Sequence, residues 1–209
     1  MRSSLPQILL LAGLIGICGP ASAGPVKSEY TIVELKRCKP IKEPKAEGAA
    51  TEGEDQGASW WCPGPKGYKL YLAEGDLRFM MAYGKKAKEQ RAATQTLPRF
   101  NSIFPDDQTE RATLEWRTRY LKGKWTPFAT ILRYFTYDGD QDPPVRGQVL
   151  VVAKVGPKAG ADACHVAYID ALANPDANAL AQKVADEKAE AFDCMKDPEV
   201  VGLTGKSPM

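Results

Sequence analysis

An export signal followed by four cysteines is the feature that most constrains how this chain can fold. Arg2 gives the first 23 residues a positive start, residues 9–18 are apolar, and Ala21-Ser22-Ala23 form a small-residue cleavage site. The apolar stretch is too short to span a bilayer, which needs about 20 residues. We therefore expect cleavage after Ala23 and a periplasmic or secreted mature protein that starts at Gly24.

The cysteines of the mature chain predict two disulfide bonds. Cys18 belongs to the signal, and an even number of cysteines remains, which in an exported protein is typical of a disulfide framework. Four cysteines permit three pairings. We favour Cys38–Cys62 and Cys164–Cys194, because each pair closes a local loop worth about 3 kcal/mol. The chain lacks the C-x-x-C pair of redox enzymes and the closely spaced ligand pairs of zinc sites.

The composition argues against several kinds of partner. The 28 Lys and Arg residues nearly balance the 26 Asp and Glu residues, so a nucleic-acid partner is not expected. A single histidine leaves little for a zinc or copper site, and we expect no cofactor. No stretch after the signal is long and apolar enough for a membrane span. We expect a monomer.

Apolar residues alternate with polar ones in several segments, which is typical of β-strands. Leu77, Phe79, Met81 and Tyr83 share one face of such a segment. The strands are expected at residues 30–35, 68–73, 77–83, 112–120, 128–137, 148–155 and 165–170. Short turns separate those after residue 110, which predicts an antiparallel meander because parallel strands need long crossovers.

One helix is expected near the C-terminus. Asn174 suits the N-cap position, Pro175 the first helical position, and Asp176 the positive end of the helix dipole. Cys194 falls in the predicted last turn, and Pro198 prevents continuation. The apolar residues that recur at helical spacing are Ala177, Leu180, Ala181, Val184, Ala191, Phe192 and Met195.

These elements predict one α+β domain over residues 24–197. It contains an antiparallel sheet of about five to seven strands with one C-terminal helix packed on a face. Residues 39–59 are rich in Lys, Glu, Gly, Ala and Pro and are expected to form a flexible loop. Residues 85–109 are expected to be a long surface connection, and residues 198–209 a loose tail.

Trp60 and Trp61 are the candidate binding residues. They stand beside a predicted disulfide, and aromatic residues are enriched in binding hot spots and can stack on sugar rings. The alternative is that one tryptophan caps the core while the other is half-exposed.

Two other motifs are weaker candidates. His165 is the only histidine, but it neighbours Cys164 on a predicted strand, where adjacent side chains point to opposite faces. We therefore expect a structural histidine and no catalytic residue. The aspartates of the loop Asp138–Asp142 imitate the start of a calcium loop, but Pro143 and Val149 stand where Gly and Glu are required. A solvated hairpin tip is the alternative, and no metal ligand is assigned.

Charged residues cluster in three places, and each cluster has a structural explanation that does not require a binding site. The basic residues between Lys85 and Arg99 lack interleaved aromatics, so a solvated surface is expected. Asp76 and Arg78 suit a salt-bridged turn. The polar face of the strand at 112–120 could meet an acidic partner, or form cross-strand ion pairs; its charged residues are Arg111, Glu115, Arg117 and Arg119.

Several strings together resemble a group of small exported proteins of rhizobium-like bacteria to which no activity is assigned. These strings lie at residues 60–64, 76–78, 164–170 and 174–178, so the likeness covers most of the mature chain. The resemblance implies a bacterial periplasmic or secreted location and transfers no site residue.

The leading functional hypothesis is a non-enzymatic binding or interaction module, whose partner is a protein or another envelope component. No Ser-His-Asp or G-x-S-x-G pattern supports a nucleophilic enzyme. One alternative is a carboxylate-based hydrolase of envelope polymers, which would need two carboxylates facing one cleft. Another is a structural or stress-related envelope protein.

Overall fold

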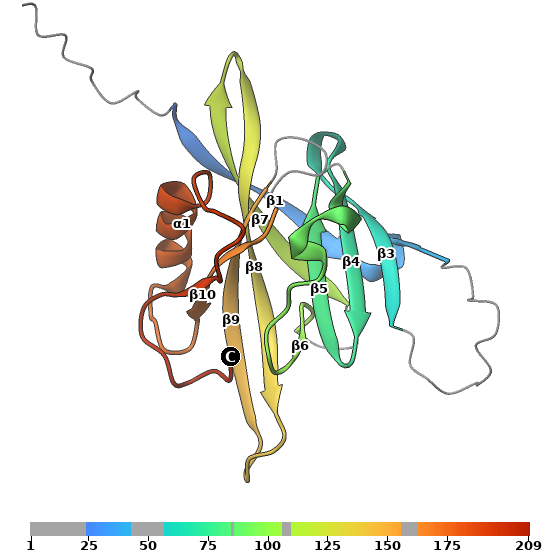
Figure 1. Cartoon of the computed structure of the whole chain (residues 1–209), viewed down its shortest axis with the longest axis vertical. Coiled ribbons are helices and arrows are strands. Elements are labelled where there is room, and N and C mark those ends of the chain that lie inside the picture. Colours follow the sequence, from blue (N-terminus) through green and yellow to red (C-terminus); the bar gives the residue numbers. More distant parts are fainter. Residues whose placement is uncertain (1–23, 43–56, 85, 106–109, 156–162) are drawn as a thin grey trace, which may run out of the picture.

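The computed structural model describes residues 24–42, 57–84, 86–105, 110–155 and 163–209. The predicted signal at residues 1–23 and most of the predicted loop at 39–59 lie outside the described residues. The described part has three layers: a helix, a large sheet and a small sheet (Figure 1). The prediction of a mixed fold with mainly antiparallel strands and one helix is confirmed.

The large sheet forms the middle layer. It contains β1 (Val26–Glu34), β6 (Phe100–Ser102), β7 (Arg111–Leu121), β8 (Lys124–Asp138), β9 (Val145–Lys154), β10 (His165–Asp170) and β11 (Glu199–Val200). Strands β7 to β10 form the predicted antiparallel meander, with β1 beside β7 and β11 parallel to β10. The short strand β6 pairs with the end of β8.

A second sheet covers one face of the large sheet, where the sequence predicted a single sheet. It contains β2 (Lys39–Pro40), β3 (Ala58–Pro63), β4 (Lys69–Gly75) and β5 (Arg78–Tyr83). β2 and β3 also occupy the two ends of the predicted loop. Alternation of side chains identifies strands but not their partners. The prediction of a single sheet was wrong. The edge of β7 is already paired with β1, so the β4–β5 hairpin does not join the large sheet and packs over its face instead.

Both faces of the large sheet are buried, which explains the nearly continuous apolar runs in β8 and β9. Toward the small sheet, Trp116, Leu132 and Val151 form the core together with side chains of β4 and β5. Toward the helix, Ile131 and Val152 pack against α1. A strand covered on both sides needs apolar residues at successive positions rather than at alternate ones.

Of the segment that the sequence predicted as a surface connection at 85–109, the described residues 86–105 are largely packed against the rest of the protein. The turns η3 (Ala87–Glu89) and η4 (Arg91–Ala93) pack on the outer face of the small sheet. Leu97, Ile103 and Phe104 are buried in the core between the sheets. Scattered apolar residues without strand or helix periodicity gave no signal for this burial.

The helix is shorter than predicted. α1 (Ala177–Lys188) begins after Asp176, and Cys194 lies in the irregular segment that follows it. Asn174 does not cap the helix. Its side-chain amide donates hydrogen bonds to the carbonyl oxygens of Asp170 and Leu203, and its Oδ1 accepts one from the Leu203 amide.

The two disulfides have the predicted pairing. Cys38 and Cys62 join the segment after β1 to β3, and so connect the large sheet to the small one. Cys164 and Cys194 join the start of β10 to the segment after α1. Each bond therefore fixes one layer to the next.

The C-terminal segment is docked rather than loose. β11 pairs with β10, and the carboxylate of Asp170 accepts hydrogen bonds from the amides of Lys206 and Ser207 and from the Ser207 hydroxyl. Ser207 also packs on Gly147, where a Cβ would lie 2.6 Å from Ser207 atoms. Only glycine allows this approach. The sequence predicted a loose tail because Lys206 and Ser207 are polar and Asp170, their hydrogen-bond partner, is 36 to 37 positions away in the sequence.

Candidate functional site

The two tryptophans do not form one surface. They are adjacent in β3, so their side chains point to opposite faces of the small sheet. Trp60 packs against the core between the sheets and lines a large cavity. Trp61 packs on the outer face beside Tyr71, with ring centroids 5.5 Å apart, and the Lys69 ammonium lies over its ring. A joint Trp60–Trp61 platform is therefore geometrically incompatible with this fold.

His165 is a buried residue and is only 1% exposed. Its Nδ1 lies 2.9 Å from the Tyr168 hydroxyl, and its backbone amide donates to the side chain of Gln95. Burial lowers the pKa of His165 to about 3, so the ring is neutral at physiological pH. The ring lies in the protein interior, away from solvent.

The aspartates of the loop Asp138–Asp142 do not converge on one point. Asp138 is buried, and its carboxylate accepts hydrogen bonds from the Asp140 amide and the Gln141 side chain. Arg99 lies 3.4 Å from the same carboxylate. Over the described ranges, the structure contains no group of three or more His, Cys, Asp or Glu side chains placed to hold a metal ion.

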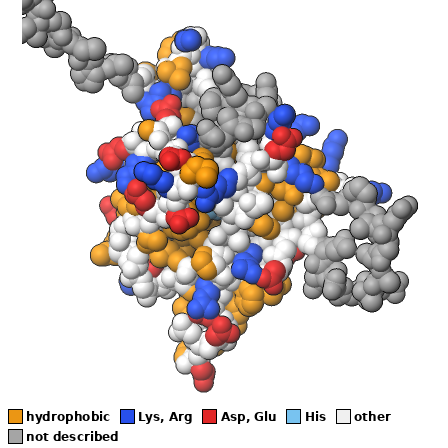
Figure 2. Space-filling model, in the orientation of Figure 1, with side chains coloured by type: hydrophobic (Ala, Val, Ile, Leu, Met, Phe, Trp, Pro, Cys, Tyr) orange, Lys and Arg blue, Asp and Glu red, His pale blue; other side chains and the backbone are white. Residues whose placement is uncertain are grey.

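The basic residues near β5 are paired with acids rather than gathered into one patch. Lys86 pairs with Glu89 and Arg91 with Asp197, whereas Lys85 lies outside the described residues. Figure 2 shows positive and negative side chains mixed over the surface around α1. The predicted salt bridge between Asp76 and Arg78 is present.

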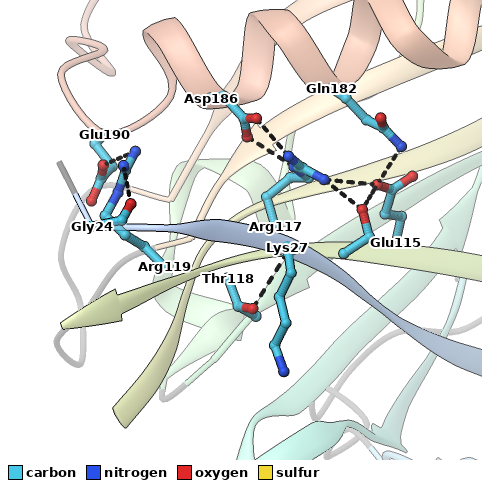
Figure 3. Close-up of polar contacts among 10 residues, drawn as sticks. Gly24, Lys27, Glu115, Arg117, Thr118, Arg119, Gln182, Asp186 and Glu190 are labelled. Carbon is cyan, nitrogen blue, oxygen red and sulfur yellow. Dashed lines mark hydrogen bonds and ion pairs between the residues drawn. The ribbon is translucent and has the colours of Figure 1, made fainter. Parts of the chain in front are cut away.

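Three charged residues of β7, namely Glu115, Arg117 and Arg119, lie on the side of the sheet that α1 covers (Figure 3). Arg117 donates two hydrogen bonds to Asp186 on the helix, at 2.8 and 2.5 Å, and also contacts Glu115 and Ser28. These bonds to Asp186 raise the pKa of the Arg117 guanidinium despite its burial. Arg119 pairs with Glu190 at 2.8 Å. This cluster attaches the helix to the sheet.

Arg111 makes the predicted cross-strand pair. Its Nε lies 3.0 Å from a carboxylate oxygen of Glu34, which is opposite it on β1. The face is therefore not one continuous acid-binding surface.

The strongest candidate site is a groove that the sequence analysis did not identify. It lies on the helix side of the large sheet, where α1 does not reach the ends of β8 and β9. Side chains alternate along β8, so Phe135 and Tyr137 lie on the helix side while Tyr134 faces the small sheet. Phe100 on β6 is opposite Tyr137, and it is 41% exposed.

We call this surface the aromatic groove and define it as Phe100, Phe135, Tyr137, Arg146 and Leu172. All five residues line one side of a cavity of about 950 Å³ around β6, and the other side of this cavity is lined by residues of the small sheet that include Trp60, Glu74 and Phe79. The Arg146 guanidinium lies 5.4 Å from the centre of the Tyr137 ring. Leu172 is 42% exposed, so this side of the sheet presents apolar and aromatic surface to solvent.

A second cavity of about 530 Å³ continues the groove toward β1 and shares Phe135 with it. We call it the Arg133 cavity. Arg133 donates hydrogen bonds to the side-chain oxygens of Gln148, at 2.8 Å, and Asn178, at 3.1 Å. Burial lowers the pKa of the Arg133 guanidinium from its usual value. The cavity is also lined by Tyr30, Arg111, Glu115 and Gln182.

Together these features suit an elongated organic ligand. Aromatic rings offer flat apolar surface, whereas guanidinium, amide and hydroxyl groups offer directional hydrogen bonds. Concave sites of about 300–1,000 Å³ are typical of small-molecule binding. The sequence signal for the groove was the alternation of Arg133, Phe135 and Tyr137. This alternation alone does not predict a groove, because the sequence does not show that α1 leaves this end of the sheet uncovered.

The chain matches no protein-family model, and neither the curated proteins nor the solved structures gave a match. In the described part of the chain, no helix is long and apolar enough to cross a membrane. The disulfides fit a protein of an oxidising compartment.

Proposed function

We propose that this protein is an exported, non-enzymatic binding module that holds its ligand in the aromatic groove. The observation that carries the proposal is the uncovered row formed by Phe100 and Tyr137, with Phe135 beside it, on an otherwise buried sheet. Exposed apolar surface on a stable protein is costly and commonly marks an interaction site. The two disulfides support export, and we propose a periplasmic or secreted location.

The support is stronger for the groove than for the tryptophan pair. Three aromatic side chains come from two paired strands, and their positions are fixed by backbone hydrogen bonds of the sheet. Rigid aromatic residues bind at low entropic cost because they have few side-chain rotations to lose. A ligand with a flat, partly apolar face would contact all three rings at once.

The experiment is an NMR titration of the isotope-labelled, oxidised protein with a panel of neutral sugars, acidic sugars, short peptides and lipid headgroups. We expect shift changes in residues 100–102, 135–137 and 146–148 for at least one compound class. Phe135→Ala should weaken that binding about five- to thirtyfold, for a loss of about 1–2 kcal/mol.

Tyr120→Ala is the control, because Tyr120 is an exposed aromatic residue of the same sheet, at 43%, that lies outside both cavities. Shift changes centred on Trp61, or equal losses in the two variants, would contradict the proposal. Absence of binding across the panel would favour a structural envelope protein.

A carboxylate-based hydrolase is the second candidate, and one observation favours it. Glu74 and Glu110 both line the large cavity, together with Trp60. If they form a catalytic pair, Glu74→Gln and Glu110→Gln should each abolish the release of reducing ends from envelope polysaccharide. Equal release by the wild type and both variants would exclude them.

A further inference from the structure

Among the charged residues that line the Arg133 cavity, Arg133 is the one that no carboxylate of the described residues neutralises. It lines the Arg133 cavity from β8, and its side chain donates hydrogen bonds to the neutral side chains of Gln148 and Asn178. The other charged residues that line this cavity are Arg111 and Glu115. Arg111 pairs with Glu34, and Glu115 pairs with Arg117. Within the described residues, Arg133 has no Asp or Glu partner.

A half-buried guanidinium without an acid is energetically unfavourable, because it loses hydration and gains no opposite charge. Its lowered pKa has this cause, since burial is the effect that shifts it. A guanidinium has five N–H donors, and two of them make the bonds to Gln148 and Asn178. Donors therefore remain for a ligand.

We propose that Arg133 binds the carboxylate of an acidic sugar whose ring lies against Phe135. The planar fork of a guanidinium matches a carboxylate, and a charged pair of this kind is stronger than a neutral hydrogen bond. This inference rests on the proposed function, because Phe135 belongs to both the aromatic groove and the Arg133 cavity.

The remaining lining of the cavity favours a sugar acid over a fatty acid. Tyr30, Thr113, Asn178 and Gln182 place hydroxyl and amide groups around the cavity. Groups of this kind can exchange hydrogen bonds with sugar hydroxyls, whereas an alkyl chain would take them out of water without offering a hydrogen bond. The apolar part of the wall is formed mainly by Ile131, Phe135 and Leu150, which suits the flat face of one ring.

The test is calorimetric titration of the oxidised protein with glucuronate, glucose, acetate and inorganic phosphate. We expect glucuronate to bind at least about tenfold more tightly than the other three probes, which lack either the charge, the ring or the planar acid. Arg133→Gln should weaken glucuronate binding by about tenfold or more, as expected for a lost hydrogen bond to a charged group.

Arg111→Gln is the matched control, because Arg111 lines the same cavity but is already paired with Glu34. Arg111→Gln should weaken glucuronate binding by less than about threefold, because the Arg111 charge is exposed to solvent and contributes little to binding. Equal losses in the two variants would overturn the assignment to Arg133. If Arg133→Gln does not fold, the Arg133 side-chain Nε–H resonance of the wild type should still shift on adding glucuronate.

The outcomes separate this inference from the proposed function. If glucose binds the groove as tightly as glucuronate and Arg133→Gln has no effect, the binding module stands and the acidic-sugar assignment fails. If phosphate or acetate binds as tightly as glucuronate, the cavity is a general anion site and the assignment also fails. If no probe in the titrations perturbs the groove, both proposals lose their support.

Discussion

The buried state of His165 makes a specific prediction about acid stability. His165 is the only histidine of the chain and is 1% exposed, with its Nδ1 beside the Tyr168 hydroxyl. Its pKa is about 3 in the folded protein, against an ordinary value of 6.5 that applies to the unfolded chain. Between these two values the unfolded state binds one more proton than the folded state. Folding stability is therefore complete above the unfolded pKa and decreases as the pH falls toward the folded pKa.

The magnitude follows from the proton linkage. Each pH unit between the two pKa values costs about 1.4 kcal/mol, so lowering the pH from about 7.5 to about 4.5 removes roughly 2–3 kcal/mol of stability. His165→Asn abolishes this contribution and retains a polar atom near the position of Nδ1. We expect the variant to lose less stability than the wild type over this pH range, by the same roughly 2–3 kcal/mol.

The assay is urea unfolding of both proteins at several pH values, with the disulfides intact. Carboxylates titrate equally in the two proteins, so the difference between their stability curves isolates the histidine. Tyr168→Phe is the control: burial rather than the Tyr168 hydroxyl lowers the pKa, so this variant should keep the wild-type slope. Parallel curves for the wild type and His165→Asn, within about 0.5 kcal/mol, would refute the reasoning.

Three further predictions concern the contacts between layers. Replacing Cys164 and Cys194 together with serine should lower the free energy of unfolding by about 3–4 kcal/mol in urea unfolding, and a loss under about 1 kcal/mol would contradict a stabilising role. Asp170→Asn should lower the free energy of unfolding by about 2–3 kcal/mol, because it weakens the hydrogen bonds to Lys206 and Ser207. The C-terminal segment should then become sensitive to limited proteolysis, and unchanged protease resistance would show that other contacts hold it. Arg117→Met should lower the free energy of unfolding by about 3 kcal/mol, because it leaves the buried Glu115 and the partly buried Asp186 without their cationic partner. Lys188→Met at an exposed pair should lower it by less than about 0.5 kcal/mol, and similar losses in the two variants would disprove the difference.

Local structure was largely predictable from the sequence. Alternation located β5, β7, β8 and β9 to within a few residues, because a strand with a buried face must repeat its apolar residues with a period of two. The pairing of the cysteines followed from their separation along the chain. The helix was predicted in the right place, but its start depended on Asn174, which the C-terminal segment engages instead.

The candidate site was not predictable, because its residues become neighbours only through the tertiary structure. Arg133 meets Asn178, which lies 45 positions away on α1, and Phe100 meets Tyr137 through the pairing of β6 with β8. Trp60 and Trp61 were attractive candidates because they are adjacent in the sequence. Adjacency on a strand instead places their side chains on opposite faces.

The sequence by itself determined the main strands, the approximate place of the helix and the charge balance, since each depends on neighbours along the chain or on composition, and it favoured the disulfide pairing that the structure has. The tertiary structure decided how the strands divide between two sheets, which faces are buried, and where the C-terminal segment docks. It also decided that α1 covers the charged face of β7 and leaves the aromatic groove open. The physical reason is that periodicity shows which side chains share a face, whereas long-range packing decides what covers that face.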